Sequence, residues 1–98
     1  MNRYPRNAPG DFYVVDGECI TCLQPQHVAP DLMELDERSG GMSHCFFGRQ
    51  PESPAEIWLA INAVEHACCG SLRYAGRDAQ VLAQLKALGL SDRCDYPA

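Results

Sequence analysis

The amino-acid sequence predicts a small α+β fold, and three observations support this prediction. Short segments rich in β-forming residues are separated by turns that contain glycine or proline. A helix-start signal at residues 53–56 opens one helical pattern, and a second helical pattern follows residue 78. Residues 1–98 are expected to form one domain, since 46% hydrophobic and 21% charged residues are ordinary for a globular chain.

Four segments are expected to be strands, because each is short, contains β-branched, aromatic or other apolar residues, and is bounded by turn signals. They cover residues 11–16, 31–36, 42–48 and 71–75. The run Arg38-Ser39-Gly40-Gly41 is a turn signal between the second and third segments, so these two are expected to form a hairpin. The first eight residues are expected to be irregular.

The first helix has the clearest start in the sequence. Ser53 stands at the N-cap, Pro54 at the first helical position and Glu56 at the third, which together form a capping box with a preset φ. The apolar positions that follow form one stripe, which is expected to face the core. The stripe consists of Ile57, Ala60, Ile61, Val64 and Cys68. Gly70 is expected to end the helix in a left-handed conformation.

A second helix is expected between Asp78, which is placed to cap its start, and Gly89, which is placed to end it. Its apolar face consists of Val81, Leu82, Leu85 and Leu88. Residues 91–98 follow this helix and are expected to form an irregular tail.

The net charge of the chain limits the classes of partner that it is expected to bind. A net charge of −5 and an isoelectric point near 4.9 argue against nucleic-acid binding as the main task. An acidic surface favours salt-dependent docking with a protein that carries a basic surface. The chain itself is expected to act as a monomer.

The compartment is expected to be the cytoplasm. Residues 1–10 are polar and proline-containing rather than a targeting segment, and no apolar run approaches the length of a membrane span. Thiols stay reduced in the cytoplasm, so the six cysteines are interpreted as ligands or redox groups before disulfides. In a secreted chain they would instead allow three disulfides.

Two of the six cysteines are separated by two residues, in Cys19-Ile20-Thr21-Cys22. A tight turn between such cysteines can point both sulfurs into one pocket, and thiolates are ligands that suit zinc, copper(I) and iron–sulfur clusters. The same spacing also fits a redox dithiol or two unrelated buried thiols. The pattern alone leaves these three interpretations open.

The surrounding sequence adds a family resemblance. Cys19–Cys22, followed by Val28-Ala29-Pro30-Asp31, resembles the cluster-binding segment of single-cluster bacterial-type ferredoxins. Arg49-Gln50-Pro51 and Ala67-Cys68-Cys69-Gly70-Ser71 are similar to the segments on either side of that family's helix, and residues 9–16 are similar to its first strand. About residues 9–76 take part, so residues 77–98 would be an added C-terminal helix and tail.

The resemblance implies a ferredoxin-like fold, in which residues 11–16 pair with residues 71–75 and a helix packs against two small antiparallel strand pairs. It also implies one four-iron cluster (4Fe–4S) and one-electron transfer, rather than an enzymatic activity. Two positions depart from the family pattern. Pro25 stands where the third cysteine should be, and Cys69 stands where a proline should follow the fourth.

The positions that match the family's ligands are Cys19, Cys22 and Cys68. Cys45 is the expected replacement for the ligand missing at Pro25, because the return strand of the hairpin packs beside the cysteine loop in that fold. His44 and Cys69 are weaker replacements. His44 and Cys45 are neighbours in a strand, so they are expected to face opposite sides of it. An open corner at Pro25 would favour a three-iron cluster (3Fe–4S).

Two other functions stay open at this point. Four cysteines also suit a structural zinc site, and Pro25 also suits a ferredoxin-like fold that has lost its cofactor and serves as an interaction module. The three histidines are expected to be structural or solvated, with His27 a candidate to hydrogen-bond a cluster sulfur. Cys94 is expected to be a thiol without a ligand role. No nucleophile–base pair, phosphate-binding loop or carboxylate pair indicates catalysis.

Overall fold

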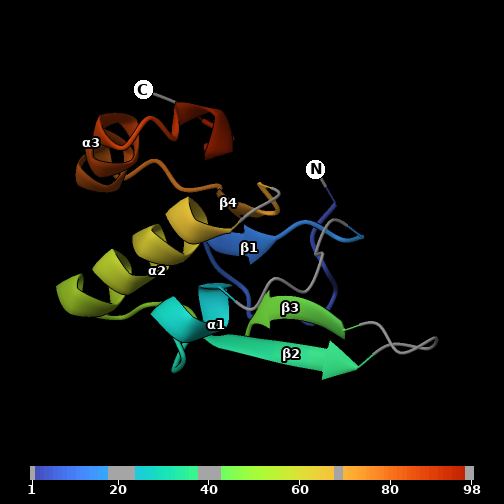
Figure 1. Ribbon diagram of the computed structural model, residues 1–98. Coiled ribbons are helices and arrows are strands. Elements are labelled where there is room, and N and C mark those ends of the chain that lie inside the picture. The colour runs from blue at the N-terminus through green and yellow to red at the C-terminus, as the bar shows by residue number, and fades with distance from the viewer. Residues whose placement is uncertain (1, 18–23, 38–42, 68–69, 97–98) are drawn as a thin grey trace.

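The computed structural model describes residues 2–17, 24–37, 43–67 and 70–96. Its strands are β1 (Phe12–Val14), β2 (Met33–Glu37), β3 (Ser43–Phe47) and β4 (Leu72–Tyr74). Its helices are α1 (Gln24–Val28), α2 (Pro54–His66) and α3 (Ala79–Ala87), followed by the 3-10 turn η1 (Ser91–Arg93). Figure 1 shows α2 lying between α1 and α3, with the strands to one side. Within these ranges the predicted α+β class is confirmed.

The strands form two antiparallel pairs, β1 with β4 and β2 with β3. Phe12 lies opposite Tyr74 in the first pair, which confirms the expected pairing of residues 11–16 with residues 71–75. Met33 lies opposite Phe47 in the second pair, which confirms the hairpin. The turn expected at residues 38–41 lies outside the described residues.

The second edge of β1 is completed by two carboxamide side chains instead of a strand. The amide of Gln50 accepts a hydrogen bond from Phe12 N–H (3.1 Å) and donates one to Phe12 O (2.8 Å). Asn7 does the same for Val14, at 3.2 and 2.9 Å. Asn7 Oδ1 also accepts from Phe47 N–H in β3 (3.0 Å). These amides satisfy the free backbone groups of the strand and join the two strand pairs.

The N-terminal segment is ordered against the hairpin, where the sequence predicted an irregular stretch. The Tyr4 ring stacks on His44 at 3.8 Å between centroids, and its hydroxyl donates to Asp36 (2.6 Å). Arg6 forms an ion pair with Asp36 (2.9 Å) and lies over the ring of Phe46. The segment therefore covers the outer face of β2–β3.

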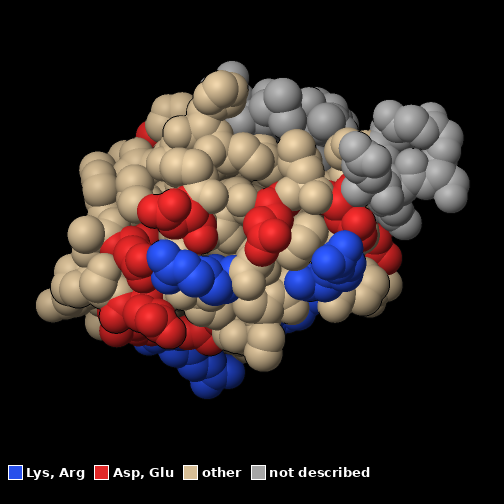
Figure 2. Space-filling view, turned by 90° about the horizontal axis from the view of Figure 1, so that it is seen from below, with Lys and Arg blue, Asp and Glu red and all other residues tan. Residues whose placement is uncertain are grey.

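The start of α2 confirms the predicted N-cap and corrects one detail of the capping box. Ser53 Oγ accepts from Glu56 N–H at 3.2 Å. The Glu56 carboxylate accepts from Glu52 N–H and from both terminal nitrogens of Arg49, rather than from the N-cap backbone. The hydrogen bonds from Arg49, then that from Glu52, lower the Glu56 pKa to about 2. On the face shown in Figure 2, acidic and basic side chains lie next to one another in this way.

The end of α2 departs from the prediction. The helix stops at His66, and Ala67 is extended (φ −66°, ψ 123°). Gly70 has the expected positive φ of 68°, but it lies beyond the helix rather than directly after its cap. The chain leaves the helix early because Ser71 must reach β1, where its carbonyl accepts from Val15 N–H (2.8 Å). The apolar stripe that placed Cys68 on a buried helix face therefore does not extend to residue 68.

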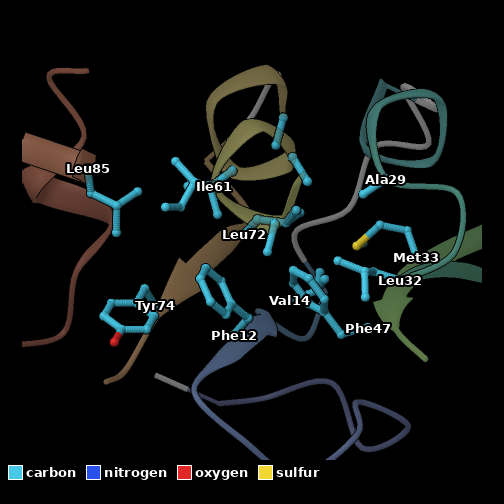
Figure 3. Close-up of a cluster of buried hydrophobic side chains, with 14 of the residues drawn as sticks. Phe12, Val14, Ala29, Leu32, Met33, Phe47, Ile61, Leu72, Tyr74 and Leu85 are labelled. Atoms are coloured by element: carbon cyan, nitrogen blue, oxygen red, sulfur yellow. The ribbon is translucent and has the colours of Figure 1, made fainter. Parts of the chain in front are cut away.

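One hydrophobic core joins both strand pairs to the helices, as Figure 3 shows. Phe12, Val14, Leu72 and Tyr74 face it from β1–β4, and Ile61 faces it from α2. The hairpin side contributes Ala29, Leu32, Met33 and Phe47. Of the predicted α2 stripe, Ala60, Ile61 and Val64 are fully buried and Ile57 packs at the margin.

Helix α3 begins and ends as predicted, apart from one residue. Asp78 accepts from the N–H groups of the first turn, and Gly89 (φ 77°) follows the C-cap. Leu90 N–H donates to Leu85 O (2.8 Å), which with Gly89 N–H on Lys86 O makes a Schellman ending. Leu88, predicted on the buried face, is 37% exposed because Leu90 supplies the apolar contact instead.

The tail after α3 packs on the sheet, which the sequence did not predict. Cys94 forms a parallel bridge with Tyr74, and Asp95 N–H donates to Tyr74 O (2.9 Å). The Asp95 carboxylate accepts from Tyr13 hydroxyl (2.5 Å) and from Arg73 Nε (2.8 Å). The tail thus lies along the edge of β4, with Cys94 in the core and the Asp95 carboxylate bonded to side chains on the opposite face of β1–β4. None of the helices in the described ranges is long and apolar enough to span a membrane.

Candidate metal centre

Four of the six cysteines, Cys19, Cys22, Cys68 and Cys69, lie outside the described residues. The described residues that flank them are Gly17 and Gln24 around the first pair, and Ala67 and Gly70 around the second. Cys45 and Cys94 are described directly, and both are buried. The site is therefore built from these flanks and from Cys45.

The first flank is attached to β3 through His44. His44 is 2% exposed, and its Nε2 accepts from Gly17 N–H at 3.0 Å. Because a backbone N–H only donates, the ring proton is on Nδ1, which donates to Cys45 O (2.8 Å). Both ring nitrogens are thus engaged in a neutral imidazole. His44, expected as a weaker replacement ligand, instead fixes the start of the cysteine loop beside Cys45.

The second flank lies beside the first. Val15 N–H donates to Ser71 O, so the residues after Cys69 run next to the residues that precede the first cysteine pair. Gly70 is packed against Arg93: a Cβ at Gly70 would lie 2.9 Å from the Arg93 Cζ. The left-handed φ of Gly70 favours glycine at that position, whereas the Arg93 guanidinium is the end of a flexible side chain and can move aside.

Cys45 faces the core from β3. It is 3% exposed and belongs to the hydrophobic core that also contains Val14 and Ala67. His44 lies on the other side of the strand, against Tyr4. The expected alternation of His44 and Cys45 is therefore confirmed, and burial keeps the Cys45 sulfur away from water.

Pro25 lies in the first turn of α1, directly after the cysteine loop. It is fully buried, and its carbonyl accepts from Ala29 N–H (2.9 Å). Proline is tolerated there because a first-turn N–H has no helical partner. His27, the expected hydrogen-bond partner of a sulfur, is on the exposed side of this helix. His66 is also exposed, with Nδ1 2.8 Å from Asn62 O.

Cys94 is more deeply buried than a tail residue was expected to be. It is 6% exposed, and burial raises the pKa of its thiol. Its S–H donates to Leu90 O at 3.8 Å, within the turn that it ends. This local partner is consistent with the expectation that Cys94 is not a ligand.

No group of three or more histidine, cysteine or acidic residues within the described ranges is arranged to hold a metal. The fit of a metal centre to this chain is instead tested by its buried polar atoms. In the described residues, buried side-chain nitrogen or oxygen atoms without a hydrogen-bond partner occur in Gln26 and Arg93. Gln26 follows Cys22 closely, and Arg93 packs on Gly70 after Cys69. One of these atoms, Gln26 Oε1, is an acceptor, and α1 and η1 lie on opposite sides of α2 (Figure 1), so the unpaired atoms do not indicate one common site.

A separate pocket of about 330 Å³ lies between β1–β4 and the helices α2 and α3. Its apolar lining includes Phe12, Ile57 and Val81, and its polar lining includes Asp11 and Asp78. Asp78 is already engaged in capping α3. Among the residues that the structure describes, no cysteine or histidine lines this pocket.

Sequence reasoning missed the residues that hold these flanks together. The roles of Asn7 and His44 depend on partners 40 and 27 residues away, and no local pattern indicates them. Gln50 was noted only as part of a resemblance, although its amide binds β1. Comparison of the whole chain with protein-family models, with curated proteins and with solved structures finds no match.

Proposed function

We propose that this chain is a small ferredoxin-like iron–sulfur protein that carries one cluster and transfers single electrons in the cytoplasm. The observation that supports the proposal most is a pair of hydrogen bonds, from Gly17 N–H to His44 Nε2 and from Val15 N–H to Ser71 O. The first bond (3.0 Å) joins Gly17, which precedes the Cys19–Cys22 pair, to the residue before Cys45. The second bond (2.8 Å) joins the same N-terminal strand region to the chain that follows Cys68 and Cys69.

These two hydrogen bonds limit how far apart the cysteines can be. Consecutive Cα atoms are about 3.8 Å apart, so Cys19 and Cys68 each start within about 8 Å of Gly17 and Gly70, respectively. Cys45 directly follows His44 in β3. These short chain distances favour a common site for the sulfurs of cysteines that are distant in sequence. The argument does not depend on Cys68 belonging to the apolar face of α2, which ends at His66.

The residues proposed to hold the cluster are Cys19, Cys22, Cys45 and Cys68. Cys45 would fill the corner where Pro25 offers no side-chain ligand, and its burial keeps water from that corner. The cluster, when bound, supplies the one-electron chemistry. The chain's own part is to orient the thiolates, to exclude water, and to dock through an acidic surface with a basic redox partner. Nucleic acid and membranes are not proposed as partners, and the chain is proposed to act as a monomer.

A structural zinc site is the second candidate, because Pro25 is fixed in α1 and leaves the cluster pattern one ligand short. Zinc has no redox role and takes three or four thiolates, so the same cysteines would only stabilise the fold. A cofactor-free interaction module is the third outcome that the experiment below distinguishes.

The experiment is anaerobic purification followed by assays of iron, labile sulfide and zinc, with Cys45→Ser compared against Cys94→Ser. Cys94 is the matched control because it is also a buried cysteine and is not among the proposed ligands. We expect iron and sulfide in the parent protein and in the Cys94 variant. The Cys45 variant should lose iron or convert to a three-iron species with altered electron-paramagnetic spectra.

Each other outcome removes a specific part of the proposal. Zinc without sulfide supports the structural zinc site, and neither metal supports the interaction module. Unchanged iron and sulfide in the Cys45 variant would remove Cys45 from the ligand set while leaving the cluster in place, with 3Fe–4S or an exogenous ligand at the open corner.

A further inference from the structure

The pocket between β1–β4 and the helices α2 and α3 has a volume of about 330 Å³ and is not used by the proposed metal centre. Proteins bind small organic molecules in mostly apolar cavities of about 300 to 1,000 Å³ that contain a few polar groups. This pocket is near the lower end of that range, so its size suits a small ligand. The residues that line it indicate the chemical class of that ligand.

The apolar part of the pocket is built on strands and helices. Phe12 and Tyr74 lie opposite each other in β1 and β4, with ring centroids 4.8 Å apart, and Figure 3 shows the Tyr74 hydroxyl directed away from Ile61. Ile57 of α2 and Val81 of α3 line the same pocket. The pocket therefore offers aromatic and aliphatic contacts, which suit a ligand with an apolar body.

The polar side chains of the pocket offer acceptors and negative charge. Asp11 and Asp78 are exposed aspartates in its lining, and no lysine, arginine or histidine within the described ranges lines it. Among the described residues, the Asp11 carboxylate has no hydrogen-bond or ion-pair partner. Asp78 caps α3 through Oδ1, which leaves Oδ2 for a ligand. The Gln50 amide nitrogen is already bound to two backbone carbonyls, so it is not a donor for the pocket.

The Tyr74 hydroxyl is close to both aspartates. It accepts a hydrogen bond from Asp78 N–H (3.3 Å). A Cβ at Gly76 would clash with both Tyr74 Oη and Asp11 Oδ2, so these two oxygens are neighbours and glycine is needed beside them. Burial raises the pKa of this hydroxyl, and the charges of Asp11 and Asp78 raise it further against the effect of the hydrogen bond from Asp78. The hydroxyl therefore stays neutral and keeps a lone pair for a second donor.

We propose that this pocket binds a small organic ammonium ion with an apolar body, as a free ligand. An ammonium group has three N–H donors. The Asp11 carboxylate, Asp78 Oδ2 and the Tyr74 hydroxyl are three acceptors that can receive them. Two carboxylates favour a cation over a neutral or anionic molecule of the same shape. The inference is independent of the proposed function, because it uses none of the cysteines.

The test is a titration of the 15N-labelled full chain with phenethylammonium chloride, followed by NMR at constant ionic strength. We expect saturable shifts at Phe12, Ile57 and Val81 with a Kd of about 1 mM, because the ligand is small and both carboxylates are hydrated. Phenethyl alcohol has the same body without the charge and should bind about fivefold more weakly. Phenylacetate should bind more weakly still, and methylammonium, which lacks the apolar body, should not saturate the pocket.

Three variants separate the two carboxylates from the fold. Asp11→Asn removes an exposed charge and should raise the Kd about fivefold. Asp78→Asn keeps a good N-cap residue for α3 and should raise the Kd about twofold, because the helix N-terminus already offsets part of that charge. Asp31→Asn is the matched control, since Asp31 is also an exposed aspartate but does not line the pocket. It should leave the Kd unchanged.

Urea unfolding with and without phenethylammonium gives a second measurement. A ligand that binds only the folded chain, at ten times its Kd, raises the folded-to-unfolded ratio about elevenfold. The absence of both saturable shifts and stabilisation overturns the inference. Equal affinity for phenethyl alcohol, or an Asp11 variant that binds as tightly as the Asp31 variant, overturns the cationic class.

Two further outcomes are distinguished by the same assays. If N-acetyl-lysine amide binds more tightly than phenethylammonium, the pocket takes a lysine side chain of a basic partner, and the free ligand is overturned. Protein without iron that still binds phenethylammonium contradicts the proposed function alone. Iron-loaded protein that does not bind it contradicts this inference alone.

Discussion

The two strand pairs are covered by opposite ends of the chain, and each cover is held by a tyrosine, an aspartate and an arginine. In both places the tyrosine hydroxyl and the arginine donate to the two oxygens of one aspartate. The trios are Tyr13, Asp95 and Arg73 on β1–β4, and Tyr4, Asp36 and Arg6 on β2–β3.

The difference between the two trios lies in the arginine. The aspartates are similarly shielded, with side chains 24% exposed for Asp95 and 23% for Asp36. Arg73 is 12% exposed, whereas Arg6 is 61% exposed. Removing the aspartate therefore leaves a largely buried cation in one place and a hydrated cation in the other. The same set of contacts should contribute unequally to stability, because desolvation decides what an unpaired charge costs.

The largest expected effect is that of Asp95→Asn. It weakens the hydrogen bonds of Tyr13 and Arg73 and leaves the guanidinium without its counter-charge, so we expect a loss of about 2 kcal/mol of unfolding free energy. Asp36→Asn should cost about 1 kcal/mol, because Arg6 can return to water. Urea unfolding followed by circular dichroism measures both. Equal losses in the two variants would contradict the comparison.

The same trio should make stability depend on pH. Burial alone would raise the pKa of the Asp95 carboxyl, but hydrogen bonds from Tyr13 and Arg73 outweigh this and lower it. A lowered native pKa means that the contribution is present above the unfolded-state pKa of about 3.9 and is lost as the pH falls through the native pKa. Between about pH 5 and pH 2 the parent protein should therefore lose more stability than Asp95→Asn.

The same network should also make the protein less stable at alkaline pH. Burial first, and then the Asp95 carboxylate, raise the pKa of the Tyr13 hydroxyl. Its contribution is present below the unfolded-state pKa of about 10 and is lost as the pH rises through the native value. Tyr13→Phe should reduce this alkaline loss of stability in pH-dependent unfolding curves, and the remainder should come from Tyr74 and Cys94, whose pKa values burial also raises. A parent protein whose stability is flat in both ranges would show that the trio is not coupled to folding.

The sequence predicted the elements well because their signals are local. Ser53 and Asp78 mark helix starts through side chains that bond to backbone two or three residues on, and Gly89 marks a helix end through its own φ. The hairpin follows from a turn signal between two short strands. The pairing of β1 with β4 was predicted only from the family resemblance, because the residues of a strand do not indicate which other strand it pairs with.

The remaining features could not be predicted, because they depend on contacts between distant residues. The apolar spacing along α2 predicted a helix that continues to Cys68. The helix instead ends at His66, and the chain then brings Ser71 to β1. The ends of the chain look irregular in sequence, yet Asn7 and Asp95 bind backbone and side chains far away in the chain. For the candidate site, burial of Cys45 was foreseeable from its strand, whereas the hydrogen bond from Gly17 N–H to His44 was not.

The smallest expected effect is that of Arg6→Ala, and it isolates the variable that separates the two trios. Asp36 keeps the hydrogen bond from the Tyr4 hydroxyl in this variant, and the lost ion pair is largely in water. We expect a loss of about 0.5 kcal/mol or less, which shrinks further in 1 M salt because screening already weakens the pair. Arg73→Ala should cost several times more and depend less on salt, since Arg73 is only 12% exposed and also loses its hydrogen bond to Asp92 O. Unfolding measured at low and high salt for both variants tests this, and an Arg6 variant as unstable as the Arg73 variant would show that exposure of the arginine does not set the strength of these contacts.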